Sequence, residues 1–176
     1  MAAAQRDTRT IEADFVQVKH LGLLEEPMVS TGRFAFKQPD RVRLDVESPE
    51  PATILIDGRN VRIPGLTQQQ QKGMGMAPIG AMFGQLAKIF RGDVEGLRQD
   101  FEVTAEADGA DVRVRLVPRR ADWKKAFRSI ELRFSGGLSH LETLRLEDEL
   151  GDSLEVTLRN VRRNRDLSDA LFRPSN

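Results

Sequence analysis

Ser153 and two histidines are the residues of this sequence best suited to catalysis. Gly151-Asp152-Ser153-Leu154 matches the opening motif of a class of serine esterases. In those enzymes the serine is activated by a histidine base that is itself held in place, and the Asp and His follow the motif along the chain. Here both histidines, His20 and His140, precede it. We therefore predict no catalytic residue and expect that the protein is not an enzyme.

The sequence is equally poor in residues for other kinds of chemistry. It has no cysteine, which excludes disulfides, thiol chemistry and cysteine-ligated zinc. The acidic run Glu147-Asp148-Glu149 could bind a hard cation, but a solvated strand end explains it more simply, because calcium-ligand spacing is missing. A formal net charge of zero and the lack of tyrosine argue against nucleic acid as a partner. We predict no metal and no cofactor, and these absences favour a binding or transport protein.

Alternating apolar and polar residues predict many short strands. The segment Arg41–Glu47 shows the pattern clearly, because Val42, Leu44 and Val46 point one way while the charged residues between them point the other. Tight turn signals such as Asp57-Gly58 separate neighbouring strands. Ten or eleven strands follow, mostly joined by hairpins, so the sheet should be antiparallel. With 176 residues and no visible boundary, we expect one domain spanning residues 1–176.

One long helical pattern interrupts the strands, from Met74 to Phe90. Its apolar residues recur at helical spacing and give one apolar face. On periodicity alone two interpretations stay open: the helix plugs a sheet as ordinary core, or it covers a cavity as a lid. Shorter helical segments are predicted after Asp93, which can cap a helix, and at Asp166–Phe172.

Several short motifs in order along the chain resemble those of the LolA family of periplasmic lipoprotein carriers. The matching segments are Ala13–Gln17, Gly32–Phe34, Pro39–Leu44, Asp57-Gly58, Asp148 to Gly151 and Asn164–Phe172. The resemblance covers nearly the whole chain and is that of a divergent member. It implies a mainly β (α+β) fold, an open antiparallel half-barrel of about eleven strands with a helical lid over its concave face.

The resemblance also implies an apolar cavity for acyl chains. From the strands we expect its walls to include Phe15, Phe34, Phe36, Val42, Leu44, Ile54 and Ile56. From the helix we expect its lid to include Met74, Met76, Ile79, Met82, Phe83, Leu86 and Phe90. Methionine suits such a surface because its thioether is flexible and polarizable.

Arg43 matches an arginine that the resemblance implies to be a lid latch. A guanidinium can satisfy several lid carbonyls at once. Alternation nevertheless places Arg43 opposite Val42 and Leu44. Either Arg43 points into the cavity and its neighbours pack outside, or it is a solvated arginine; the resemblance favours the first arrangement.

The function implied by the resemblance is transport of a lipoprotein or other lipid-linked cargo across the periplasm. It implies an inner-membrane donor and an outer-membrane acceptor as partners, and we expect a monomer located in the periplasm. The first ten residues lack the apolar segment of a signal peptide. The alternative is a non-catalytic envelope sensor or interaction module on the same fold, in the manner of RseB.

Overall fold

The computed structural model describes residues 8–58, 60–65, 87–89, 93–125, 127–136 and 140–174. Its strands are β1 (Thr10–His20), β2 (Met28–Lys37), β3 (Arg41–Ser48), β4 (Ala52–Asp57), β5 (Asn60–Arg62), β6 (Phe101–Asp108), β7 (Asp111–Pro118), β8 (Ser129–Ser135), β9 (His140–Glu147) and β10 (Ser153–Arg163). Among the described residues it also forms the helices α4 (Val94–Asp100) and α5 (Ala121–Lys124) and the short 3₁₀ helix η1 (Asp169–Phe172).

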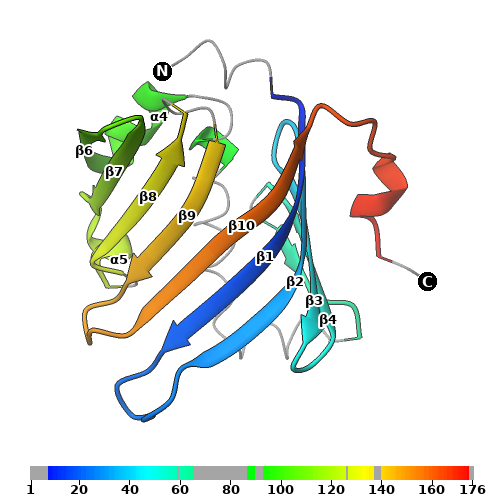
Figure 1. The fold of residues 1–176 in the computed structure, drawn as a ribbon, viewed down its shortest axis with the longest axis horizontal. Helices are drawn as coiled ribbons and strands as arrows, with labels where there is room; N and C mark the ends of the chain where they lie inside the picture. Colours follow the sequence, from blue (N-terminus) through cyan, green and yellow to red (C-terminus); the bar gives the residue numbers. More distant parts are fainter. Residues whose placement is uncertain are drawn as a thin grey trace.

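All ten described strands form one antiparallel sheet, in the order β5-β4-β3-β2-β1-β10-β9-β8-β7-β6. Consecutive strands pair as neighbours, except β5 and β6, which lie at the two edges of the sheet. β1 also pairs with β10, so the first and last strands meet in the middle of the sheet. The sheet curls and does not close (Figure 1). The predicted mainly β, open antiparallel architecture is confirmed, with ten described strands where the sequence predicts about eleven.

The alternation in the sequence places the apolar side chains on one face, called here the inner face. On β3, Val42 is buried and Leu44 packs against the same core, while Arg43 and Asp45 lie on the opposite, outer face. The same core takes in residues from both halves of the sheet, from Phe36 on β2 to Phe134 on β8. The two faces of one sheet thus present different chemistry.

Gly32 lies at the irregularity that the sequence predicts in β2. The register between β2 and β3 shifts between Thr31 and Gly32. A Cβ at this position would collide with the backbone carbonyl oxygen of Asp45 and with the Phe15 ring. Only glycine lets β3 approach β2 this closely while Phe15 lies across it.

The helices lie at different places along the sheet (Figure 1). In α4, as predicted, Asp93 caps the first turn and accepts a hydrogen bond from the backbone N–H of Gly96 at 2.9 Å. α5 brings Trp123 edge-on to both Phe101 and Phe127, a group of aromatic residues that the sequence pattern did not predict. η1 lies beside β2–β4, in the C-terminal segment predicted to form a short helix or turn.

Candidate functional site

The inner face carries continuous rows of apolar side chains that cross the strands. Cross-strand pairing aligns Ile56 on β4, Val42 on β3, Phe36 on β2 and Ile11 on β1. All four are buried, and Phe36 is 0% exposed. A second row joins Ile54, Leu44, Phe34 and Ala13. Such rows form a broad apolar wall, which can bury either core residues or a hydrocarbon ligand.

The seven wall residues predicted from the strands lie together on this face. Phe15, Phe34, Phe36, Val42 and Ile56 are buried, and Leu44 and Ile54 are partly buried against the same core. Their role in binding acyl chains stays a prediction.

The predicted lid helix is described only at residues 87–89. There Ala87 and Ile89 are buried in the same core as the inner face, and the Lys88 ammonium group lies 3.0 Å from a carboxylate oxygen of Asp100. The predicted lid residues Met74, Met76, Ile79, Met82, Phe83, Leu86 and Phe90 lie outside the described residues. The choice between core plug and lid therefore stays a prediction for that segment.

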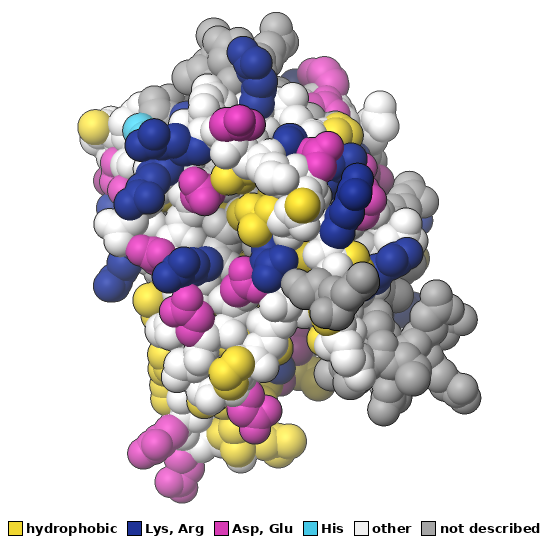
Figure 2. Space-filling view, turned by 90° about the vertical axis from the view of Figure 1, so that its right-hand side faces the viewer, with side chains coloured by type: hydrophobic (Ala, Val, Ile, Leu, Met, Phe, Trp, Pro, Cys, Tyr) yellow, Lys and Arg dark blue, Asp and Glu magenta, His cyan; other side chains and the backbone are white. Residues whose placement is uncertain are grey.

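The outer face of β2 and β3 holds the C-terminal segment in place. The Lys37 ammonium group donates to the Leu167 carbonyl at 2.6 Å and pairs with the Asp169 carboxylate at 2.7 Å, which Arg41 also contacts at 3.0 Å. The hydrogen bond from Lys37, its charge and that of Arg41 hold the pKa of Asp169 below its ordinary value. On this side of the molecule basic and acidic side chains are interspersed around small apolar areas (Figure 2).

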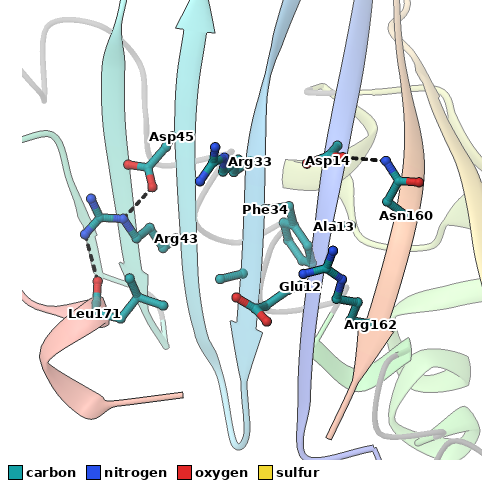
Figure 3. Close-up of a pocket in the computed structure, with 11 residues that line it drawn as sticks. Glu12, Ala13, Asp14, Arg33, Phe34, Arg43, Asp45, Asn160, Arg162 and Leu171 are labelled. Atoms are coloured by element: carbon teal, nitrogen blue, oxygen red, sulfur yellow. Dashed lines mark hydrogen bonds and ion pairs between the residues drawn. The ribbon is translucent and has the colours of Figure 1, made fainter. Parts of the chain in front are cut away.

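Arg43 belongs to this outer face (Figure 3). Its Nη1 donates to the Leu171 carbonyl at 2.8 Å, and its Nε donates to the Asp45 carboxylate at 2.6 Å. The expectation that Arg43 points toward the apolar side is wrong, because alternation along β3 gives that side to Val42 and Leu44. In the described residues Arg43 joins η1 to β3, and its role as a lid latch stays a prediction.

Asp45 completes the contacts of Arg43. Thr53 on β4 donates to its second carboxylate oxygen at 2.7 Å. Burial by itself would raise the pKa of Asp45, but the hydrogen bonds from Arg43 and Thr53 and the charges of Arg43 and Arg33 outweigh it, so the pKa lies below its ordinary value. Asp45 is therefore an anion at neutral pH, and it neutralises the Arg43 guanidinium.

A groove of about 390 Å³ runs along this outer face beside Arg43. Charged and polar side chains of both signs line it, including Glu12, Asp14, Arg33 and Arg162. Asp14 accepts a hydrogen bond from the Asn160 side chain at 2.7 Å. Mixed charge and internal pairing make this a hydrated surface, unlike the apolar inner face.

The fold brings together the chemistry-bearing residues that the sequence separates, but it does not join them into a catalytic group. His20 lies directly opposite Ser153 in the pairing of β1 with β10, and Glu147 lies opposite Ser153 on the other side. Among the described residues, no hydrogen bond links the Ser153 hydroxyl to the His20 ring, and His20 is exposed. The described part of the chain also contains no group of three or more His, Asp or Glu able to hold a metal ion.

Arg163 is a residue of the inner face that simple alternation along the chain does not predict. It pairs with Ile11 and so lies at the end of the apolar row formed by Ile56, Val42, Phe36 and Ile11. A bulge beside Ala13 hides this from simple alternation, because Asn160, with φ of 53°, adds a residue to β10. Val161 packs against the core, and Arg163 follows it by two residues. This spacing is the sequence signal that could have placed Arg163 on the inner face.

The fold and the two faces define a class of protein: an open antiparallel β-sheet with an apolar inner face and a polar outer face. The family model described as "Outer membrane lipoprotein carrier protein LolA" matches residues 6–175. The chain therefore belongs to the LolA family, whose members are outer-membrane lipoprotein carriers rather than enzymes. None of the helices in the described part is long and apolar enough to cross a bilayer.

Curated relatives agree with this assignment, and a solved structure shares the fold. An outer-membrane lipoprotein carrier protein of Halorhodospira halophila is 30% identical over 176 residues, which cover 96% of this chain and 76% of the relative. Another from Dechloromonas aromatica is 28% identical over 172 residues, covering 96% and 78%. The fold resembles that of MucB in the Pseudomonas aeruginosa MucA/MucB complex (TM-score 0.54, 15% identity, 99% of this chain). The chain spans 58% of that structure's chain.

Proposed function

We propose that this protein is a periplasmic carrier that shields the acyl chains of a lipoprotein or other lipid-linked cargo and passes the cargo toward the outer membrane. The observation that carries the proposal is the apolar inner face, on which rows of buried side chains cross the central strands within a LolA-family chain. The walls are Phe15, Phe34, Phe36, Val42, Leu44, Ile54 and Ile56, and the cover is the apolar face of Met74–Phe90. We infer a monomer that meets an inner-membrane donor and an outer-membrane acceptor.

The energetics of acyl-chain transfer suit such a face. Each methylene group removed from water contributes about 0.8 kcal/mol, so one long chain contributes on the order of 10 kcal/mol, similar to the stability of a whole domain. That is enough to extract a chain from water. Release then requires that the apolar face be offered to a competing apolar site, which is the role of an acceptor.

The test is to identify what the protein carries. Protein purified without detergent from a periplasmic extract is examined by native mass spectrometry and by organic extraction of the same sample. We expect acyl-chain-bearing molecules at about one per protein. Purified protein that carries no lipid, and that also fails to bind the uncharged apolar dye N-phenyl-1-naphthylamine, would contradict the proposal.

A matched pair of variants on neighbouring strands sharpens this test. Ile54→Glu places a carboxylate on the inner face, where an unpaired charge costs several kcal/mol against an apolar ligand. Ser48→Glu adds the same charge at the exposed end of β3. We expect the first variant to lose bound lipid and dye and the second to keep both.

One finding favours a second candidate, a sensor or interaction module. The fold likeness to MucB, whose structure is solved in complex with MucA, shows that this architecture also occurs in a protein that binds another protein. If lipid is absent while a periplasmic segment of a membrane protein binds in a pull-down with purified components, the sensor function replaces the carrier function.

A further inference from the structure

Arg163 continues a row whose positions on β1, β2, β3 and β4 are all apolar. The row that crosses β4, β3, β2 and β1 consists of Ile56, Val42, Phe36 and Ile11, and Arg163 on β10 continues it. The four apolar members are buried. A charged side chain therefore ends an apolar row about 19 Å long at the usual strand spacing.

One nitrogen of the Arg163 guanidinium is a buried donor that has no hydrogen-bond acceptor. Its Nε is buried and makes no hydrogen bond, and it is the one side-chain nitrogen or oxygen in this state among the described residues. Among the described residues Arg163 forms no ion pair with a carboxylate. A buried donor without a partner costs about 1–3 kcal/mol, and folded proteins contain few of them. The buried Nε is therefore a position where the oxygen of a ligand would find a donor.

Arg163 lies at a narrow cleft of about 10 Å³ beside the inner face, which has room for about one water, so a larger group enters only if the cleft widens. Pairing between β9 and β10 covers only Thr143–Glu147 against Ser153–Thr157, so the second half of β10 runs without β9 beside it. The residues that line this narrow cleft with Arg163 are Thr8, Ile11, Phe134, Leu141, Leu158 and Val161. Apart from Thr8 and Arg163 they are all apolar, and most belong to the core or pack against it.

The local charge at this end of the sheet is mainly positive. Arg9 and Arg165 are exposed and lie close to Arg163 at the paired ends of β1 and β10, with one exposed acid, Asp166, beside Arg165. Glu12 and Arg162 lie opposite each other on the outer face, away from the cleft. Burial lowers the pKa of Arg163, but an arginine stays protonated in proteins at neutral pH. The cleft thus joins an apolar interior to a fixed positive charge.

We propose that Arg163 binds the oxyanion head group of an amphiphilic cargo, a phosphate or a carboxylate, while its hydrocarbon chain lies along the row of Ile11, Phe36 and Val42. The inference rests on the proposed carrier function and specifies its substrate class. A guanidinium presents Nε and a terminal nitrogen side by side, a geometry that matches two oxygens of one head group. The ligand would then satisfy the buried Nε and take up the apolar row in a single orientation.

The experiment compares amphiphiles that share one chain and differ in the head group. Lauryl phosphate, laurate and lauryl alcohol each displace N-phenyl-1-naphthylamine from the full chain, and dissociation constants are obtained by competition. The wild-type protein should bind at least one of the two anions more tightly than the alcohol. In Arg163→Gln that anion should bind about ten- to hundredfold more weakly, while the alcohol should change less than about twofold because its contacts are apolar.

Arg162→Gln is the matched control, because it removes the same charge from the adjacent residue on the outer face. It should leave all three affinities within about twofold. Arg163→Lys keeps the charge but loses the planar fork, so it should give an intermediate loss. The relative affinities of lauryl phosphate and laurate identify whether the cargo head is a phosphate or a carboxylate.

Four outcomes would overturn the inference. In the first, Arg163→Gln leaves the affinities for both anions unchanged. In the second, it weakens binding of the alcohol as much as binding of the anion, which indicates a structural role. In the third, Arg162→Gln weakens binding of the anion as much as Arg163→Gln does. The fourth applies if Arg163→Gln does not fold: the inference is then wrong if the wild-type protein binds neither anion more tightly than the alcohol. Failure of the wild type to bind the dye or any amphiphile contradicts the carrier function itself, whereas binding of the alcohol without an effect of Arg163 contradicts only the head-group site.

Discussion

Arg43 and Arg163 lie on opposite faces of the same sheet and have opposite surroundings. Arg43, on the outer face, donates to Asp45 and to the Leu171 carbonyl, so it joins η1 to β3. Arg163, on the inner face, ends an apolar row and keeps a buried Nε without a partner. A guanidinium whose acceptors are supplied by the chain is a structural connection, whereas one without them is available to a ligand. The predictions below test this difference between the outer and inner faces.

The largest expected effect is on the inner face. Phe36→Ala removes a side chain that is 0% exposed, so it should lower the free energy of unfolding by about 3–5 kcal/mol in urea or guanidinium denaturation. Leu23→Ala, at a side chain that is 99% exposed, should change it by less than about 0.5 kcal/mol. A loss below about 1 kcal/mol for Phe36→Ala would mean that this part of the inner face is not packed core.

A smaller loss is expected where the outer face holds an apolar anchor. Leu167 is buried in the segment that leads to η1, and its carbonyl accepts from Lys37. Leu167→Ala should lower the free energy of unfolding by about 2–3 kcal/mol. The exposed Leu150 provides the control, since Leu150→Ala should be neutral in the same thermal and chemical unfolding. Equal effects of the two variants would show that the C-terminal segment is not packed against the sheet.

The stability that the Arg43–Asp45 ion pair contributes on the outer face should depend on pH. The pKa of Asp45 is lower in the folded protein than in the unfolded chain, so its stabilising effect is present above the unfolded value of about 4 and is lost as the pH falls through the folded value. Asp45→Asn should therefore cost about 1 kcal/mol at pH 7 and progressively less below pH 4. Denaturation curves between pH 7 and pH 3 measure this, and a cost independent of pH would contradict the assignment.

The smallest effect is expected for Arg43 itself, and it separates the two arginines. Arg43→Met should lower stability by about 1 kcal/mol or less, because the pair with Asp45 is only partly buried. Since Arg43 faces away from the apolar rows, the variant should bind N-phenyl-1-naphthylamine and lipid as the wild type does. Lost lipid retention in Arg43→Met, with the fold intact, would restore the latch function that the family resemblance implied.

The strand pattern was predictable because side chains alternate between the two faces of the sheet along each strand. Alternation at Arg41–Glu47 places Val42 and Leu44 together whatever the rest of the chain does, and Asp57-Gly58 turns the chain by its own geometry. Gly32 was a predictable irregularity for the same reason. Sequence pattern therefore indicated an antiparallel sheet with one apolar face, and the ordered motifs indicated the family and, through it, the open half-barrel.

The direction of Arg43 shows where such reasoning fails. Alternation alone put Arg43 on the face opposite Val42, and the resemblance overrode it. The acceptor of its Nη1, Leu171, lies 128 residues away, and no local pattern connects the two. The aromatic group of Phe101, Trp123 and Phe127 escaped prediction in the same way, because it forms between α5 and the start of β6.

The sequence by itself determined which side chains share a face, because the two-residue period of a strand is a property of the local backbone. Tertiary structure decided what each face meets. Pairing of β1 with β10 aligned Arg163 with Ile11, across a bulge that alternation does not reveal. It also laid the C-terminal segment across β2 and β3, where Lys37, Arg41 and Arg43 hold it. Partners far apart in the chain are set by sheet order and register. Only the folded molecule therefore distinguishes Arg43, whose acceptors the chain supplies, from Arg163, whose buried Nε has no acceptor among the described residues.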